Sequence, residues 1–290
     1  MRSLVQIQSS RPLFWTEDHA NDGSQVVRFS RQPFTSNVPD ILVTNDDGIH
    51  AAGLRALVKG LAGLATVSVV APCQERSAAA QSLTVRHPIF CEQIAEREWA
   101  IEGTPADAMM VALHRLFPKP PDLVVSGINR GGNLGENVFY SGTVGAATEA
   151  VINHVPAFAI SLAHRGNEFA YDHAAQFARQ LAELILRKGL PSGVLLNVNV
   201  PLEWKGGVRL TRQSGKVTRT VLQEGADPRG RIYYWLNEEP VSGPLDPESD
   251  YAAVFAGHIS VTPIELERTH EPSLSHLSHW ADLLEASLKA

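Results

Sequence analysis

Apolar and polar residues alternate in blocks through the middle of the chain, and the blocks predict strands and helices in turn. Apolar residues recurring at intervals of three and four predict helices at 49–64, at 104–117, after residue 142 and at 172–188. Short, nearly continuous apolar runs separate them and are typical of strands buried on both faces of a sheet: ILVT, VSVVAP, DLVVSGIN, AFAISLA and VLLNVNVP. This alternation predicts an α/β fold with a mostly parallel sheet and helices on both faces.

The pattern changes after Pro201. The chain then has short β-like pieces separated by Gly, Pro and Asp, and a last helical stripe at 274–289; the pieces are VRLTRQ, TRTVLQ, RIYYWLN and GHISVTPI. We therefore expect an α/β core at 39–201 and a β-rich arm with a returning C-terminal helix at 202–290. The aromatic run Tyr233, Tyr234 and Trp235 is interpreted as packing either on the chain's own body or on another subunit.

Residues 1–38 differ from the rest of the chain. They contain scattered Arg, Ser and Gln without periodicity, and no sustained apolar segment of the kind a signal peptide needs. The acidic residues Glu17, Asp18 and Asp22 argue against an organellar transit peptide. We expect a poorly ordered N-terminal extension.

The composition excludes several classes of function. Among 290 residues, 44% are hydrophobic and 19% charged, which is typical of a soluble globular protein. No apolar run approaches the roughly 18 residues of a membrane span. The formal net charge of −6 does not favour binding to nucleic acid or to an anionic membrane. Small molecules are therefore the expected partners.

The chain has two cysteines, Cys73 and Cys91. They form no CxxC pair and have no zinc-type histidine spacing, so neither a disulfide framework nor a structural zinc site is predicted. We expect two reduced thiols in a cytoplasmic protein, although the sequence leaves a single bridge between them open.

Two adjacent acids, Asp46 and Asp47, follow the strand ILVT and precede Gly48. An Asp-Gly pair between apolar runs often marks a β-hairpin, which would require period-two alternation afterwards. The residues after Gly48 instead have helical spacing, so the turn joins a strand to a helix. This places both acids at the carboxyl edge of the sheet, where open α/β folds bind ligands.

Two further polar loops also follow apolar strands, at 74–84 and at 126–143. Because loops after parallel strands emerge at one edge, we expect them to meet the acid pair. Oxygen atoms from Asp46, Asp47, Ser77 and Asn129 would suit a hard cation, Mg²⁺ or Mn²⁺, better than zinc. His50 begins the next helix, and we favour a structural role for it over a role beside the metal.

The third loop ends at Ser141, Gly142 and Thr143, where a helix is predicted to begin. The free N–H groups of a helix N-terminus can bind phosphate, although Ser or Thr there is also an ordinary N-cap. No P-loop and no dinucleotide-binding GxGxxG motif is present. A metal beside an anion site indicates metal-assisted phosphoester hydrolysis, in which Asp46 could orient or deprotonate the attacking water.

The ordered set of motifs resembles SurE, the survival protein family of metal-dependent nucleoside monophosphate phosphatases. The resemblance runs from about Asp40 to the C-terminus. It rests on ILVTNDDG, VVAP, RS with SLT, GTPAD, PDLVVSGIN, GNLG, YSGTVGAA, NVNVP, DPRG with YYW, and SDYAAV with ISVTP.

The resemblance implies a Rossmann-like core, a β-rich arm exchanged between subunits, and homodimers or homotetramers. It implies catalytic roles for Asp46 and Asp47. One divalent cation per subunit would be held at Asp46, Asp47, Ser77 and Asn129, and phosphate would bind near Asn45, Ser77, Asn129, Ser141, Gly142 and Thr143. The implied substrates are nucleoside 5′- and 3′-monophosphates, together with short polyphosphate.

One departure from the family pattern lies close to this site. The family has RSGxS after its second strand, whereas here Ser77 is followed by Ala78, Ala79 and Ala80. Alanine adopts positive φ only at a cost, so altered rate or substrate preference is expected. Two alternatives stay open: a metal- and nucleotide-binding sensor without turnover, and an aspartyl-phosphate enzyme with Asp46 as nucleophile. The adjacent acids differ from the DxDx[TV] pattern of the latter.

Overall fold

The computed structural model describes residues 15–19, 25–29, 38–163, 170–215, 218–240 and 244–289. Most of the expected N-terminal extension at 1–38 lies outside these residues. Two strands in that region, β1 (Trp15–His19) and β2 (Gln25–Phe29), pair antiparallel.

A nine-stranded sheet forms the centre of the described chain, in the order β10-β13-β9-β8-β7-β3-β4-β6-β5. Neighbouring strands from β9 to β6 are parallel, whereas β5 and β13 are antiparallel to β6 and β9, and β10 is parallel to β13. The strands are β3 (Asp40–Thr44), β4 (Thr66–Pro72), β5 (Phe90–Ala95), β6 (Glu98–Glu102), β7 (Leu123–Arg130), β8 (Ala157–Ala163), β9 (Val194–Pro201), β10 (Val208–Leu210) and β13 (Ile259–Glu265).

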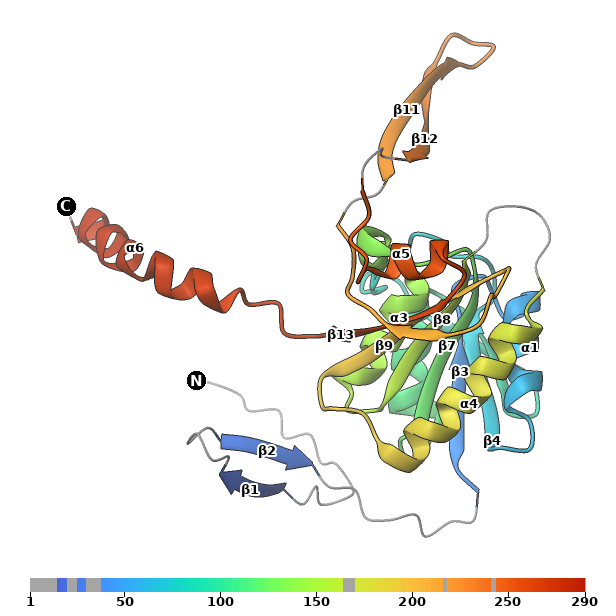
Figure 1. Ribbon diagram of the computed structural model, residues 1–290. Coiled ribbons are helices and arrows are strands. Elements are labelled where there is room, and N and C mark those ends of the chain that lie inside the picture. The colour runs from blue at the N-terminus through green and yellow to red at the C-terminus, as the bar shows by residue number, and fades with distance from the viewer. Residues whose placement is uncertain are drawn as a thin grey trace.

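Helices cover both faces of this sheet (Figure 1). Successive side chains of β3 point to opposite faces, so Ile41 and Val43 join one hydrophobic core and Leu42 joins the other. The first core is closed by α1 (Ala52–Leu61) and α4 (Asp172–Lys188), and the second by α2 (Pro105–Val111) and α3 (Gly142–Ile152). The predicted α/β class with a mostly parallel sheet is confirmed.

The helices form where the spacing of apolar residues predicts them. Helix α4 has the predicted bounds and ends at Gly189, whose φ of +76° favours glycine. Helix α2 begins at a capping box between Thr104 and Asp107 and continues as a π-helix, η1 (Ala112–Leu116). A short 3₁₀ helix, η2 (Gly135–Phe139), precedes α3.

The central sheet continues beyond Pro201, because β10 and β13 both belong to it. The hairpin of β11 (Thr218–Ala226) and β12 (Ile232–Pro240) stands away from the body, and α6 (Glu271–Lys289) extends away from it in another direction (Figure 1). A further helix, α5 (Asp250–Phe255), lies between β12 and β13 in sequence. The sequence analysis did not predict α5 or the antiparallel pair β5 and β6.

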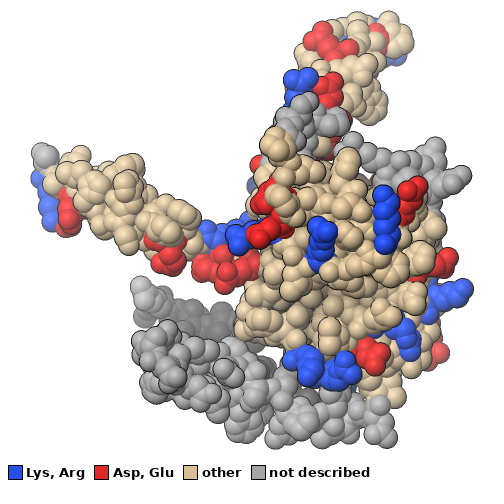
Figure 2. All heavy atoms as spheres, in the orientation of Figure 1, with Lys and Arg blue, Asp and Glu red and all other residues tan. Residues whose placement is uncertain are grey.

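The surface has mixed charge. On the face shown in Figure 2, Lys and Arg side chains are interspersed with Asp and Glu. None of the helices in the described part of the chain combines the length and the apolar character needed to cross a bilayer. Cys73 and Cys91 are free, exposed thiols.

Candidate active site

The acid pair lies in the turn between β3 and α1, as predicted. Asn45 is fully buried, and its Nδ2 donates to the carbonyl oxygen of Gly48 at 3.0 Å. Gly48 has a φ of +101°, and an added Cβ would lie 3.2 Å from the carbonyl carbon of Gln74. Asn45 therefore shapes the turn, and Gly48 allows the loop after β4 to pass directly over it.

Asp46 contacts the N-terminus of α3. Its side chain is 4% exposed, and its Oδ1 accepts a hydrogen bond from the Thr143 hydroxyl at 2.5 Å. A Cβ on Gly142 would lie 2.8 Å from the Asp46 Cβ, so only glycine fits there. Burial raises the pKa of Asp46, while hydrogen bonds from the Thr143 side chain and from the backbone amides of Thr143 and Gly142 oppose that rise. The helix N-terminus thus already receives an anionic group.

Asp47 faces the end of β7. Its Oδ2 accepts a hydrogen bond from the Arg130 amide at 3.1 Å. Burial and the neighbouring charge of Asp46 raise the pKa of Asp47 to about 6, although the Arg130 amide acts against this. Two partly desolvated carboxylates side by side repel each other, and a cation between them would remove that repulsion.

Asn129 lies next to Arg130 at the end of β7, close to Asp47. Its Nδ2 donates to the carbonyl oxygen of Gly131 at 2.8 Å. That bond uses the amide nitrogen and not Oδ1, which is the atom that a hard cation would take. Asn129 therefore fits the predicted ligand set.

Ser77 lies on the loop after β4, which is bonded to the acid turn. The Arg76 amide donates to the Asp46 carbonyl oxygen at 2.7 Å, which holds this loop against the turn. The Ser77 hydroxyl itself donates to Glu75 Oε1 at 2.8 Å and is exposed. The structure bonds Arg76, the residue before Ser77, to the acid turn, but the Ser77 hydroxyl bonds Glu75 and not either acid.

The donors fit a hard cation in type. In the described residues, no group of three or more His, Cys, Asp or Glu side chains gathers as a ligand set. The acid pair would have to be completed by neutral oxygens from Ser77, Asn129 and water, which is the kind of environment that Mg²⁺ and Mn²⁺ accept. His50 is exposed.

Two features around the candidate site were not predicted from the sequence. Burial raises the pKa of Tyr171, and the nearby charge of Asp47 raises it further, so this tyrosine lies near Asp47. The sequence feature connected with Tyr171 is Gly53. An added Cβ at Gly53 would lie 2.0 Å from the Ile128 carbonyl oxygen and 3.1 Å from Tyr171 Cε1, so only glycine fits there.

The second missed feature is a buried amide network below the loop that leads to α3. The backbone amide of Asn133 donates to Asn199 Oδ1 at 2.8 Å, and the side-chain Nδ2 of Asn133 donates to the Ser161 hydroxyl at 2.9 Å. The Asn133 carbonyl oxygen accepts from Asn197 and Asn199 at 2.7 and 3.1 Å. The NVNVP motif thus fixes the start of this loop over β8 and β9.

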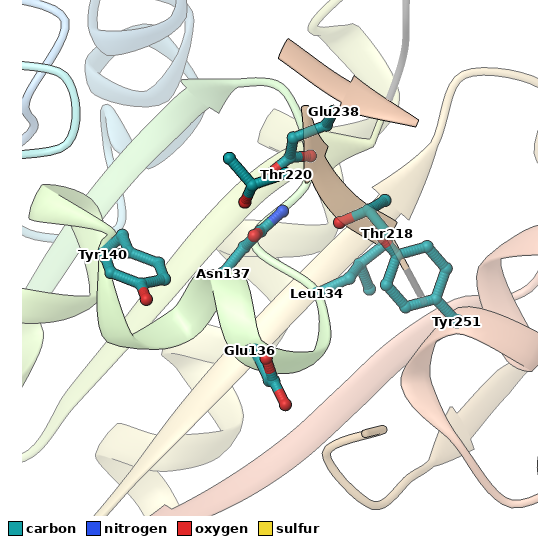
Figure 3. A pocket seen from close by; sticks show the side chains of 8 residues that line it. All are labelled: Leu134, Glu136, Asn137, Tyr140, Thr218, Thr220, Glu238 and Tyr251. Atoms are coloured by element: carbon teal, nitrogen blue, oxygen red, sulfur yellow. The ribbon is translucent and has the colours of Figure 1, made fainter. Parts of the chain in front are cut away.

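A hollow of about 70 Å³ lies between η2 and the hairpin, near the end of the same loop (Figure 3). In this view the Asn137 side chain points from η2 toward Thr220 and Glu238 of the hairpin. The acid pair does not line this hollow, so the hollow is separate from the candidate site. The residues that line the hollow are Leu134, Glu136, Asn137, Tyr140, Thr218, Thr220, Glu238 and Tyr251.

Comparison with known proteins shows the family of the chain. The chain is 47% identical over 245 residues to the 5′-nucleotidase SurE of Geobacter sulfurreducens, which covers 83% of this chain and 93% of that protein. It is 46% identical over 250 residues to the 5′-nucleotidase SurE of Desulforudis audaxviator, with 83% and 96% covered. The crystal structure of the SurE protein from Aquifex aeolicus superposes with a TM-score of 0.76 at 35% identity, over 84% of this chain and 100% of that one. The model of the family "Survival protein SurE" matches residues 41–220. The resemblance seen in the sequence is confirmed, and the chain belongs to the SurE family.

Proposed function

We propose that this protein is a divalent-metal-dependent 5′-nucleotidase that hydrolyses nucleoside monophosphates to nucleoside and phosphate. The relatives at 46–47% identity carry the name 5′-nucleotidase. The observation that supports the proposal is the contact of Asp46 with the N-terminus of α3, because a carboxylate is a ligand that hard cations prefer and a helix N-terminus favours anions. Hydrolysis of 3′-monophosphates and of short polyphosphate would use the same groups.

Asp46, Asp47, Ser77 and Asn129 would hold one Mg²⁺ or Mn²⁺ ion per subunit. Such an ion, when bound, polarises a phosphoryl oxygen and lowers the pKa of a bound water. Ser77 would serve as a ligand through a lone pair of its hydroxyl oxygen, which is compatible with the hydrogen bond that the hydroxyl donates to Glu75 Oε1 at 2.8 Å.

The phosphate would bind at the start of α3. The Ser141 hydroxyl accepts from the Val144 amide at 3.0 Å and caps the helix, while the amides of Gly142 and Thr143 point to the Asp46 carboxylate. For phosphate to bind here, these two amides and the Thr143 hydroxyl would turn from the Asp46 carboxylate to the phosphate oxygens, and the helix dipole would favour the negative charge. Asp46 would orient the attacking water and accept its proton.

The proposal is tested by phosphate release from AMP and GMP in the presence of Mn²⁺ or Mg²⁺, repeated with excess EDTA. We expect release that EDTA abolishes and that added metal restores. Hydrolysis that persists in EDTA, or no hydrolysis of any mononucleotide with metal present, would refute the proposal. A thermal shift with AMP and Mn²⁺ but without turnover would indicate a sensor instead.

We also propose that the arm joins subunits into a homodimer or homotetramer. The hairpin exposes Trp235 by 64% and Leu236 by 74%, and the described part of α6 has no buried residue. Apolar surface of this kind usually marks an interface. Light scattering should give a mass of two or four chains, and a monomer would refute this.

The free thiols at Cys73 and Cys91 are compatible with a cytoplasmic location.

A further inference from the structure

The loop at 74–84 carries Ser77 to the candidate site without forming a helix or a strand itself. Its position therefore depends on contacts with other elements. At its start, the Arg76 amide bonds the Asp46 carbonyl oxygen at 2.7 Å. In its middle, the Ala80 amide donates to the Tyr140 carbonyl oxygen at 3.1 Å, and Gln81 Nε2 donates to Glu149 Oε2 at 3.0 Å.

The far end of this loop is held by Asp107 in the first turn of α2. Asp107 is 1% exposed, and its carboxylate accepts from the Thr84 amide at 2.8 Å and from the Thr84 hydroxyl at 2.6 Å. It also accepts from the Thr104 amide at 2.8 Å, and the Thr104 hydroxyl donates to the Ser82 carbonyl oxygen at 2.6 Å. One buried carboxylate thus ties the loop to α2.

The bonds to Thr84 exceed what α2 itself requires. The capping box is complete with Thr104 and Asp107 alone, because each side chain accepts from the other's backbone amide. A carboxylate has further acceptor sites, and here two of its bonds go to Thr84 across 23 positions of sequence. The extra bonds serve the loop, and bonds to an ionised acceptor are the strong ones.

We propose that Asp107 and Thr84 are positioning residues for the metal site, acting through the loop that carries Ser77. The proposal rests on the proposed function, because it needs Ser77 to take part in metal binding. With the loop anchored at Asp46 and at Asp107, Ser77 is held within reach of the acid pair. Thr84 adds to the bonds that Arg76, Ala80 and Gln81 make, and without it the loop would be free at its far end and would hold Ser77 less firmly.

The test compares Thr84→Val with Thr84→Ser in the full chain. Valine keeps the shape and the backbone bond but removes the hydroxyl, whereas serine keeps the hydroxyl. Mn²⁺ affinity is measured by titration calorimetry, and amide hydrogen exchange is followed at residues 75–84 in the metal-free protein. We expect Thr84→Val to weaken Mn²⁺ binding by about tenfold or more, as residues behind metal ligands commonly do. Exchange in the loop should become faster, and Thr84→Ser should behave as wild type.

A second variant, Asp107→Asn, replaces one of the two accepting oxygens by an NH2 donor and removes the charge, and it should exceed the effect of Thr84→Val. If the Asp107→Asn variant fails to fold, Thr84→Val still decides the question, because Thr84→Val leaves the capping box of Thr104 and Asp107 intact. Wild-type Mn²⁺ affinity and wild-type loop exchange in Thr84→Val would overturn the inference, as would absence of Mn²⁺ binding by the wild-type chain. If the wild-type chain binds Mn²⁺ but hydrolyses no mononucleotide, the 5′-nucleotidase proposal fails. The affinity and exchange comparison would still test the positioning role.

Discussion

Thr143 donates a hydrogen bond to Asp46 at 2.5 Å across 97 positions of sequence, and this bond joins the acid turn to the N-terminus of α3. Both partners are buried, so the two elements cannot separate without leaving polar atoms unpaired. In the proposed function, the same hydroxyl would donate to a phosphate oxygen.

Replacement of Thr143 by valine should lower kcat/KM for AMP by about a hundredfold, which is typical when one preorganised donor is lost. Thr143→Ser keeps the hydroxyl and should retain most of the activity. Steady-state kinetics with Mn²⁺ at saturation makes the comparison. Equal rates for the valine and serine variants would show that the hydroxyl has no part in the reaction.

Replacement of Asp47 by asparagine should abolish most Mn²⁺ binding and reduce AMP hydrolysis by roughly a thousandfold. Metal activation contributes several kcal/mol, and about 1.4 kcal/mol corresponds to a factor of ten in rate. Glu92→Gln, which changes an exposed carboxylate on β5, is the matched control and should leave both quantities unchanged. The metal assignment would be disproved by an Asp47→Asn variant that retains wild-type affinity for Mn²⁺.

The pKa of Asp47 predicts how stability depends on pH without metal. Since it rises from 3.8 to about 6 on folding, the folded chain binds more protons than the unfolded chain between these values. The free energy of unfolding should therefore decrease as pH rises through that window and then level off. In EDTA, the Tm should fall from pH 4 to pH 6 more steeply for wild type than for Asp47→Asn. Parallel curves of Tm against pH for the two proteins would show that folding does not raise the pKa of Asp47.

The same protonation should compete with metal. Because a carboxylate must be ionised to bind a cation, Mn²⁺ affinity should weaken as pH falls below about 6. Calorimetric titrations at pH 5.5 and pH 7.5 measure the change. An affinity independent of pH across this range would argue against Asp47 as a ligand.

The run of alanines after Ser77 predicts a stabilising substitution. Ala78 has a φ of +59°, in the left-handed region where a Cβ costs roughly 1–2 kcal/mol. Ala78→Gly should relieve that strain while increasing the entropy of the unfolded chain, for a net gain of about 0.5 kcal/mol. Ala79 has no positive φ, so Ala79→Gly should destabilise the chain. Urea denaturation measures both, and an Ala78→Gly variant less stable than wild type would contradict the prediction.

Much of the site followed from the sequence because it depends on topology. Asp46 and Gly142 come after strands of one parallel sheet, and the carboxyl ends of such strands meet at one edge whatever the details of packing. The helical stripes of α1 and α4 likewise have a period that the sequence displays directly.

The antiparallel pair β5 and β6 was missed for a physical reason. The residues of β5 are exposed along its whole length, since it forms one edge of the sheet. An exposed edge strand has no buried face to impose alternation on its sequence, so FCEQIA shows no periodic signal. Only the pairing with β6 makes it a strand.

Residue types and spacing, by themselves, determined the α/β class, the alternation of the core strands and helices apart from β5 and β6, and the approach of Asp46 to the start of α3. The tertiary structure alone decided that Asp107 holds Thr84, that Tyr171 lies near Asp47 and that Ser77 bonds Glu75. Periodicity and strand order follow from backbone geometry, which repeats along a chain. A single hydrogen bond between two loops depends on where side chains end after packing, and no local pattern encodes that position.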